Sequence, residues 1–542
     1  MKELYTFLIA LFFVALFQRI EAQTNSSNLP LISINTNGAQ IVNEPKITAQ
    51  LTVFNKGKGA TNILSDVPVL TCNIGIEIRG STSQAFPKKS YGFETVTETG
   101  ENLNVSLLGL PAENDWVLYA PYNDKTFIRD IIAYQLFRNM GHYASRYVLC
   151  ELYLNNEYYG VYVLLEKIKQ DKNRVGITKL EPTDITGVPI TGGYIFKIDK
   201  PTGSDNEGWT SSYLSKIETG KKINLLYHDP SASKLHHEQQ EYIRNFMFNF
   251  EKVLASENYA EEESGYRTLM DINSFVDYFI LNELSKNIDS YRTSAFFHKD
   301  RDDKNKKLVA GPPWDYNLGF GNANYYTGEV VTDWVYQGIP ESDGRHIPFW
   351  WQRFLNDPVF YSTMKQRYTN FRGNILKTEN IHKFIDSLAL VLNEPQARNF
   401  AVWKIMGKYV WPNPYYGSTY QQDIDYLKKW IGDRLVWMDS NLLILNTHGL
   451  NQVVSNGAIV YPNPFQEQFF VEFLPDAQMN NAKLELYDLT GKKLFQDNIS
   501  LNASGTLYSS GDVKTGSLSR GVYILKIKPN TGKEFSVKII KK

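Results

Sequence analysis

The chain contains 542 residues, a length that allows two to four domains at roughly 100–200 residues each. Apolar residues make up 42% and aromatic residues 14%, so a wholly disordered protein is excluded. The 57 basic and 58 acidic residues nearly cancel, which excludes a general nucleic-acid or membrane-surface binder but not a local basic cleft. Only two cysteines, Cys72 and Cys150, occur, which excludes a disulfide framework and a cysteine-rich zinc site. A single bridge between them is one alternative, and two separate buried thiols is the favoured one.

The first 22 residues have the layout of a secretory signal peptide. Lys2 precedes an apolar run over residues 4–17, and Ala22 occupies a suitable cleavage position. The run is shorter than the ~20 residues that span a bilayer, so a cleaved leader is favoured over an uncleaved anchor. We therefore expect an exported mature chain that begins near residue 23 and has no transmembrane segment.

Residues 31–200 are dominated by short β patterns. Segments rich in β-branched and aromatic residues, bounded by Gly, Asn or Pro, lie at 72–79, 147–154, 160–165 and 193–198. Asn155 and Asn156 predict a hairpin turn between two of these segments. One helix is predicted over residues 124–140, where apolar residues recur every three or four positions.

After residue 230 the apolar period becomes helical. Helices are predicted over residues 238–254, 271–284, 348–371 and 420–443. We therefore expect an α+β fold in which residues 31–445 form one domain of two lobes. The N-terminal lobe, 31–200, is β-rich, and the C-terminal lobe, 201–445, is mainly helical.

A polar linker over residues 446–457 precedes a third region, residues 458–542. Strand patterns in this region lie at 469–473, 483–487, 522–527 and 534–540. Many short strands in so few residues predict a small β-sandwich, with a domain boundary near residue 450.

Two carboxylates flank a predicted β-hairpin with strands at 294–298 and 308–310. Asp289 lies in the loop that enters this hairpin, and Asp315 lies in the loop that leaves it. The pair suits one carboxylate that orients a hydroxyl and another that holds Mg²⁺, a hard cation that relies on substrate phosphates for further ligands. The same spacing also fits a turn-capping Asp315 and an Asp289 that closes an Asx turn.

A second constellation runs from a strand through a Gly/Ser/Thr turn and back, over residues 79–91. Arg79 and Ser81 lie at this turn, and Lys88 and Lys89 follow it. Small residues leave backbone N–H groups free for phosphate oxygens, which a strand-borne lysine also reaches. The ordinary alternative is a common turn followed by two solvated lysines.

Weaker candidates lie elsewhere. Glu166 ends the strand at 160–165 and either lines a pocket edge or is an ordinary strand end. Trp350 and Trp351 are aromatic enough to stack sugars, although core packing is the favoured interpretation of this pair. Nucleophile-elbow, Rossmann and P-loop motifs do not occur in the sequence, which disfavours those sites.

Five motifs follow one another along the chain. They are RGSTSQAFPKKSY at 79–91, DWVLYAPYNDKTFIR at 115–129, YGVYVLLEKI at 159–168, NELSKNIDSY at 282–291 and PWDYNLGFGN at 313–322. Together they resemble the CotH kinase family, which was named for a spore-coat protein and has an atypical protein-kinase-like fold. The resemblance covers roughly residues 30–445 and implies a kinase that binds ATP between two lobes.

The resemblance implies a nucleotide-binding role for the turn after residue 79. Lys89 would contact the nucleotide phosphates, with Arg79 and Ser81 in the same turn, and Glu166 would lie near the inter-lobe hinge. The residue that pairs with Lys89 is left open between Glu166 and Asp130.

The resemblance also implies catalytic and metal-binding roles. Asp289 would be the catalytic-loop acid, and Asp315 would be the Mg²⁺ ligand. Asn317 stands where many family members carry Asp. Its amide oxygen is still a ligand that Mg²⁺ accepts, but it brings no charge to a second metal.

The tail carries its own motifs, YPNPF at 461–465, LYDLTGK at 486–492 and RGVYILKI at 520–527, and it ends in KIIKK. They resemble the type A sorting domain of the type IX secretion system, over residues 458–542. The resemblance implies a Bacteroidetes-type Gram-negative bacterium and an outer-membrane exporter as partner. The product would be a secreted or cell-surface protein, from which such a tail is often removed.

The leading hypothesis is an exported kinase that transfers the γ-phosphate of ATP, with Mg²⁺, to Ser or Thr of a secreted or surface protein. The rival is a surface adhesin or structural binding protein on a kinase-like scaffold without turnover. The sorting tail and the scarcity of ATP outside cells support this rival. A carbohydrate-active surface protein that uses its tryptophans is a third alternative.

Overall fold

The computed structural model describes residues 26–201, 207–442 and, in shorter stretches, much of 453–542. The predicted signal peptide, residues 1–22, lies outside the described residues, as does most of the predicted linker, 446–457. The chain divides into two units. The first unit extends to Pro348 and includes Ile375–Leu435, and the second comprises Phe349–Asn374 and Val436–Lys542.

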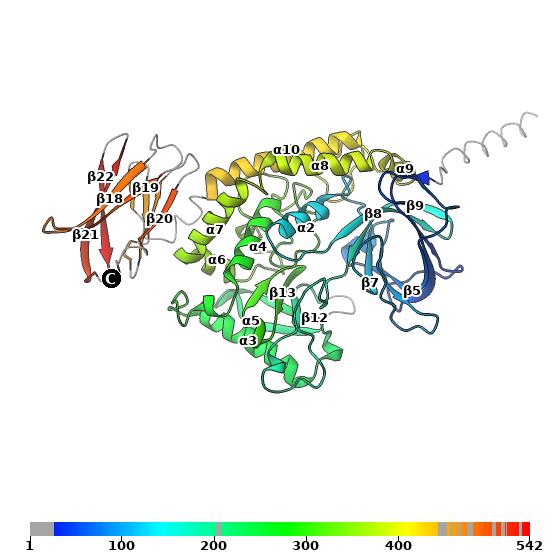
Figure 1. Ribbon diagram of the computed structural model, residues 1–542, viewed down its shortest axis with the longest axis horizontal. Helices are drawn as coiled ribbons and strands as arrows, with labels where there is room; N and C mark the ends of the chain where they lie inside the picture. Colours follow the sequence, from blue (N-terminus) through cyan, green and yellow to red (C-terminus); the bar gives the residue numbers. More distant parts are fainter. Residues whose placement is uncertain are drawn as a thin grey trace, which may run out of the picture. The chain divides into compact units, whose positions relative to one another are not determined.

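A closed β-barrel forms the beginning of the first unit (Figure 1). Its strands are β2 (Leu31–Asn35), β3 (Ile47–Phe54), β5 (Leu70–Arg79), β6 (Ser90–Val96), β7 (Asp115–Tyr119), β8 (Tyr147–Leu154) and β9 (Glu157–Glu166). The order around the barrel is β2-β3-β5-β6-β7-β9-β8, and the pair that closes it, β2 and β8, is parallel. A separate two-stranded sheet pairs β1 (Ser26–Ser27) with β4 (Asn62–Ile63).

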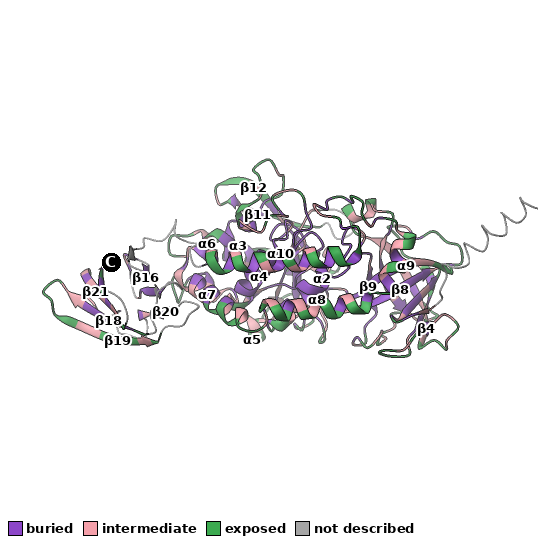
Figure 2. Ribbon diagram, turned by 90° about the horizontal axis from the view of Figure 1, so that it is seen from above, coloured by how far each residue is buried: buried purple, intermediate pink, exposed green. Residues whose placement is uncertain are grey.

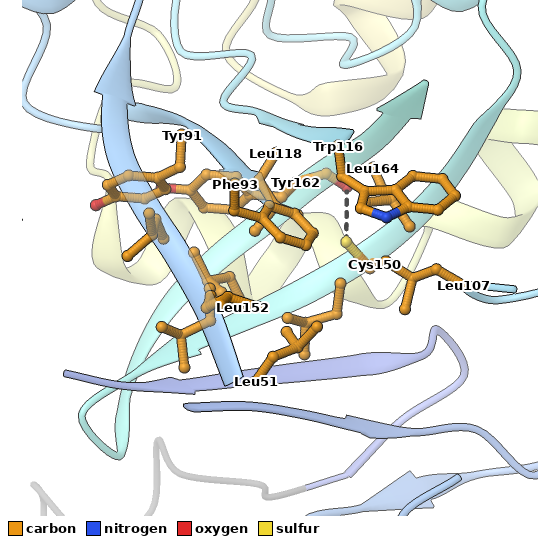
Figure 3. Packing of buried hydrophobic residues seen from close by; sticks show 14 of the residues in the cluster. Leu51, Tyr91, Phe93, Leu107, Trp116, Leu118, Cys150, Leu152, Tyr162 and Leu164 are labelled. Atoms are coloured by element: carbon orange, nitrogen blue, oxygen red, sulfur yellow. Dashed lines mark hydrogen bonds between the residues drawn. The ribbon is translucent and has the colours of Figure 1, made fainter. Parts of the chain in front are cut away.

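Large apolar side chains fill the barrel, because successive residues of a strand point to opposite faces. Phe93, Trp116 and Tyr162 are almost fully buried, and Figure 3 shows them gathered in one cluster. The Cys150 thiol lies among them and donates to the Tyr162 carbonyl at 3.6 Å. Cys72 and Cys150 are both free, which confirms two separate thiols, although Cys72 is only partly buried.

Of two local predictions for the barrel region, the hairpin turn is confirmed and the start of the helix is not. The predicted hairpin turn is confirmed: Asn155 and Asn156 join β8 to β9 with φ angles of 51° and 67°, as tight hairpin turns require. The predicted helix begins later than residue 124, as α2 (Arg129–Asn139). The cause is Asp124, whose carboxylate accepts the Arg129 N–H at 2.9 Å and holds the preceding residues as a loop.

A second sheet follows the barrel. Its order is β11 (Gly208–Lys216), β12 (Thr219–Asp229), β10 (Tyr194–Ile198), β13 (Ala295–Lys299) and β14 (Leu308–Ala310). The β13–β14 hairpin matches the prediction. In contrast, β10 was expected in the N-terminal lobe, yet it pairs with β12 and β13, so the change of sheet falls before residue 200. The hairpin of β11 and β12 was not predicted.

The first unit also contains helices that follow α2 along the chain. They are α3 (His237–Ala255), α4 (Ile272–Ser285), α5 (Asp302–Asn305), α8 (Thr378–Leu392), α9 (Pro395–Val402) and α10 (Tyr420–Asn441), the last of which continues into the second unit. Short 3₁₀ turns are η1 (Thr82–Ala85), η2 (Pro189–Thr191), η3 (Ala232–Lys234), η4 (Tyr266–Thr268) and η5 (Val335–Gln337). Helices α8 and α10 lie side by side, each with a buried and an exposed face (Figure 2). Over the described ranges, no helix combines the length and hydropathy needed to cross a membrane.

The single helix predicted over residues 348–371 is wrong, because two helices stand there. They are α6 (Trp350–Leu355) and α7 (Pro358–Arg372), both in the second unit. The break occurs where the Asp357 carboxylate accepts the Val359 N–H at 2.9 Å and Pro358 opens the new helix. Trp350 and Trp351 are 0% and 1% exposed, so the prediction that they belong to the core is confirmed.

Two four-stranded sheets make up the C-terminal part of the second unit. One contains β15 (Val453–Ser455), β16 (Ala458–Tyr461), β17 (Phe470–Phe473) and β20 (Thr506–Ser509). The other contains β19 (Lys493–Ser500), β18 (Asn481–Asp488), β21 (Gly521–Pro529) and β22 (Phe535–Lys541). Both contribute to one apolar core, as a β-sandwich requires. Strand β15 falls within the predicted linker. Together, the sheets and helices confirm the α+β class.

Candidate functional site

Asp315 stands in the loop that leaves strand β14 and has an unusual backbone conformation. Its φ angle is 65°, a left-handed value that costs free energy for a residue with a Cβ and that concentrates at functional sites. The Asp315 N–H donates to Tyr134 Oη at 3.1 Å, and the Asp315 carbonyl accepts from Asn287 Nδ2 at 3.0 Å. These bonds hold a conformation in which the Asp315 side chain is exposed.

Negative charge is concentrated around this side chain. Surrounding protein desolvates the Asp315 carboxyl even though solvent reaches it, and with the charges of Asp130, Asp289 and Asp199 this raises its pKa to about 7. Lys200 opposes the shift. Such a group of carboxylates favours a bound cation, because a cation offsets their mutual repulsion.

Asp130, on α2, forms hydrogen bonds that hold the loop of Asp315 in place. It is buried, and its Oδ1 accepts from the Tyr316 N–H at 2.6 Å and from Tyr134 Oη at 3.2 Å. Burial raises the pKa of Asp130 to about 6, against the effect of these hydrogen bonds. Asp130 therefore fixes the backbone on which Asp315 stands.

Asp289 lies in the loop after α4, and the C-cap residue of that helix, Lys286, has a left-handed conformation. The Asp289 carboxylate is partly exposed and accepts from Arg292 Nη2 at 3.2 Å. Within the described ranges, neither Asp289 nor Asp315 bonds a neighbouring backbone N–H through its carboxylate, so the turn-capping alternatives gain no support. Asn287 makes that type of turn instead, because its Oδ1 accepts from the Asp289 N–H at 3.3 Å.

Asn287 thereby connects the two carboxylate-bearing loops. Its Oδ1 binds the backbone of Asp289, and its Nδ2 binds the backbone of Asp315, while the side chain itself is buried. The structure thus brings together the two acids that flank the predicted hairpin. Asn287 was not singled out from the sequence, although it stands within the NELSKNIDSY motif.

The oxygen atoms near Asp315 fit only some of the coordination modes that proteins offer Mg²⁺. No group of three or more His, Cys, Asp or Glu side chains suited to a metal ion occurs in the described part of the chain. Mg²⁺ instead uses one or two protein oxygens together with substrate phosphates. The Asp315 carboxylate fits that use, because no described residue donates a hydrogen bond to it. Asn317 is buried, and its Nδ2 donates to Asn123 Oδ1 at 3.4 Å.

The turn after β5 lies beside the Asp315 loop. The Arg79 guanidinium stands over the Trp314 ring, 5.3 Å from its centroid. Lys200 Nζ donates to Thr82 Oγ1 at 3.2 Å, and Ser81 is exposed in the same turn. Asp199 and Lys200 were not singled out from the sequence; their signal was a charged pair directly after a buried strand.

Lys89 holds this turn in place through its ammonium group. Its Nζ donates to the carbonyls of Gln84 and Phe86, both at 2.6 Å. Neither residue left open as its partner, Glu166 or Asp130, contacts it in this structure. The Lys89 side chain therefore lies at the predicted turn but is engaged by backbone oxygens there.

Lys88 is the deeply buried lysine of the pair. Its Nζ donates to the Val161 carbonyl at 2.5 Å and to Asn399 Oδ1 at 2.8 Å, and it stands 4.8 Å from the centroid of the Tyr162 ring. Burial lowers the pKa of Lys88 to about 7. Sequence reasoning did not separate the two lysines, which both lie just before strand β6.

Glu166 is buried at the end of β9, and its carboxylate is fully engaged. Arg146 donates to it from Nη2 at 2.6 Å, from Nε at 3.0 Å and from its backbone N–H at 3.0 Å. Tyr143 Oη adds a further bond at 3.2 Å. This bidentate salt bridge between Arg146 and Glu166 fixes the end of strand β9.

Comparison with protein families gives two matches. The family of CotH kinase proteins matches residues 76–438, and the family of secretion system C-terminal sorting domains matches residues 459–542. The first match covers more than half of the chain, so the protein belongs to the CotH kinase family. The second indicates secretion, with sorting to the cell surface by the type IX machinery. No curated protein matches the chain.

Proposed function

We propose that the protein is an exported phosphotransferase that moves the γ-phosphate of ATP to a Ser or Thr hydroxyl of a secreted or surface protein. One observation carries the proposal: Asn287 joins the loops of Asp289 and Asp315, two acids that the sequence separates by a whole hairpin. An acid for the acceptor hydroxyl and another for the phosphate side are the parts that phosphoryl transfer needs.

The chemistry assigns different work to the two acids. Asp289 orients the acceptor hydroxyl and takes its proton as the hydroxyl oxygen bonds to the γ-phosphorus. The bond between that phosphorus and the β,γ-bridging oxygen breaks, and ADP leaves. Asp315, with Asn317 as a neutral neighbour, would hold Mg²⁺, which when bound neutralises charge on the transferring phosphates.

The turn after β5 supplies the nucleotide side of this proposal. Arg79, Ser81 and Lys89 lie in or beside it, and Lys200 adds a cation near Asp315. Backbone N–H groups of such a turn donate hydrogen bonds to phosphate oxygens, and the cations balance the phosphate charge. Glu166 would not contact the nucleotide itself, and would instead fix the end of β9 through its pair with Arg146.

The proposal extends to fold and location. The β-barrel and the region after it would act as the two lobes of a kinase-like fold, with ATP between them. The signal peptide and the sorting domain would carry the chain across both membranes through the type IX machinery. Because ATP is scarce outside cells, we propose that transfer occurs before or during export.

The test is transfer of labelled phosphate from ATP by the purified mature chain in Mg²⁺, with autophosphorylation as readout. Asp289→Asn and Asp315→Asn should each abolish incorporation while circular dichroism stays unchanged. Asp303→Asn is the matched control, since Asp303 is exposed on α5 and pairs with Arg301. Absence of both transfer and ATP binding in the unaltered chain would favour the adhesin.

A further inference from the structure

The segment 323–346 follows the PWDYNLGFGN motif and contains almost no regular secondary structure, apart from the η5 turn. Side chains from the loop of Asp289 and from two helices nevertheless hold it in place. Lys286 donates to the carbonyls of Val330 and Thr332, Glu283 accepts from the N–H groups of Val335 and Tyr336, and Arg434 donates to the carbonyls of Val331 and Asp333. The segment is therefore fastened to the same stretch of chain that carries Asp289.

Arg292 connects the segment 323–346 directly to Asp289, the proposed catalytic acid. Its side chain is 1% exposed, and its Nη2 reaches Asp289 Oδ1 at 3.2 Å. Its Nη1 reaches Asp343 Oδ2 at 2.9 Å and the Arg345 carbonyl at 3.3 Å, while its Nε donates to the Ile288 carbonyl at 2.9 Å. One guanidinium thus joins Asp289 to the segment 323–346.

Asp343 is held for this contact from several sides. Its carboxylate also accepts from Tyr326 Oη at 2.8 Å and from the Arg345 N–H at 2.8 Å. The Tyr326 ring lies against Arg292, 5.5 Å from ring centroid to guanidinium carbon. Against the effect of its partial burial, these donors and the Arg292 charge lower the pKa of Asp343. The ion pair is therefore complete at neutral pH.

We propose that Arg292 is a positioning residue for Asp289 and that Asp343 is its anchor. In many kinases, a loop beside the catalytic acid becomes ordered when an added phosphate pairs with arginine. Here a carboxylate of the chain itself, that of Asp343, pairs with the arginine, so the segment 323–346 is held without modification. The inference rests on the proposed role of Asp289, and its geometric part can be tested apart from that role.

The test uses the full mature chain with Asp343→Asn, Asp343→Glu and Tyr326→Phe. Asp343→Asn should lower the rate constant for transfer by about ten- to hundred-fold, because a loosened acid is misplaced relative to the hydroxyl. The KM for ATP should stay within about twofold, because Arg292 has no part in nucleotide binding. Asp343→Glu should restore most of the rate, and Tyr326→Phe should give a smaller loss.

Hydrogen exchange of the segment 323–346 provides a readout that needs no activity. Exchange should be faster in Asp343→Asn and unchanged in Glu341→Gln, a control that removes an exposed acid of the same segment facing Lys216. The proposal is overturned if Asp343→Asn keeps the wild-type rate, if KM for ATP rises in step with the loss, or if Asp343→Glu is equally slow. If the unaltered chain transfers no phosphate, the proposed function fails and the positioning role with it, while exchange still decides whether Asp343 anchors the segment.

Discussion

Asn287 and Asp315 are joined by a 3.0 Å hydrogen bond from the Asn287 amide to the Asp315 carbonyl. The partners are separated in sequence by the whole β13–β14 hairpin, so the bond closes the two ends of that hairpin against each other. The same amide receives the Asp289 N–H through its oxygen. A single buried side chain therefore sets the separation of the two acids on which the proposed chemistry depends.

Replacing Asn287 should damage both stability and transfer. Asn287→Ala leaves the Asp315 carbonyl and the Asp289 N–H without this partner, at a cost of about 1–3 kcal/mol in the free energy of unfolding. We expect transfer to fall at least about tenfold, as misplaced groups cause. Denaturant unfolding and phosphate transfer measure the two effects. Asn393→Ala, on the surface after α8, is the control, and wild-type transfer by folded Asn287→Ala would refute the connection.

Lys88 should make stability depend on pH. Burial lowers its pKa from 10.5 to about 7, although the nearby Cys150 and Glu151 act in the opposite direction. Between these values the unfolded chain binds more protons than the folded chain, so the free energy of unfolding rises with pH. The rise should be about 2 kcal/mol between pH 7 and pH 9. Denaturant unfolding across this range should show it in the wild type and in Lys89→Met. An equal rise in Lys88→Met would contradict the assignment.

Gly160 should be intolerant of a side chain. Its φ angle is 97°, and an added Cβ would lie 2.3 Å from Asn399 Oδ1, the acceptor of the Lys88 ammonium. Gly160→Ala should therefore lower the free energy of unfolding by about 1–3 kcal/mol beyond the backbone strain itself. Gly100→Ala isolates the strain, because Gly100 has a φ of 86° and open space around it. Equal losses in the two variants would show that the contact with Asn399 is unimportant.

Glu166 should contribute mainly to stability through Arg146. Glu166→Gln removes the charge from a carboxylate that is 0% exposed, which should cost roughly 2 kcal/mol because Arg146 itself remains partly solvated. Urea unfolding measures the loss. The exposed pair of Lys179 and Glu181 supplies the control, since Glu181→Gln should change stability by less than about 1 kcal/mol. A loss in Glu166→Gln as small as the control's would show that the pair is weak.

Local patterns were enough to predict several elements. The Asn155–Asn156 turn and the β13–β14 hairpin depend on short runs of neighbours, so their residue types predict them. The helix break at Pro358 was also encoded locally, in Asp357 and Pro358. It was missed because apolar spacing continues across the break.

Contacts between distant segments were beyond sequence reasoning. Lys88 is buried and donates to Asn399, far along the chain, whereas Lys89 donates to carbonyls of its own turn. Strand β10 resembles a barrel strand in composition, and only its pairing with β13 places it in the second sheet. The Arg292–Asp343 pair depends likewise on the path of an irregular segment. The sequence spacing predicted that Asp289 and Asp315 flank one hairpin. It did not predict Asn287 and Arg292, the side chains that hold their loops.

The most direct measurement is mass spectrometry of the full mature chain after incubation with ATP and Mg²⁺, beside Asp289→Asn. We predict phosphoserine or phosphothreonine in the unaltered chain and none in the variant, while both bind ATP. An unmodified chain that binds ATP but transfers nothing to itself or to co-secreted proteins would contradict the account, and so would equal modification of the variant.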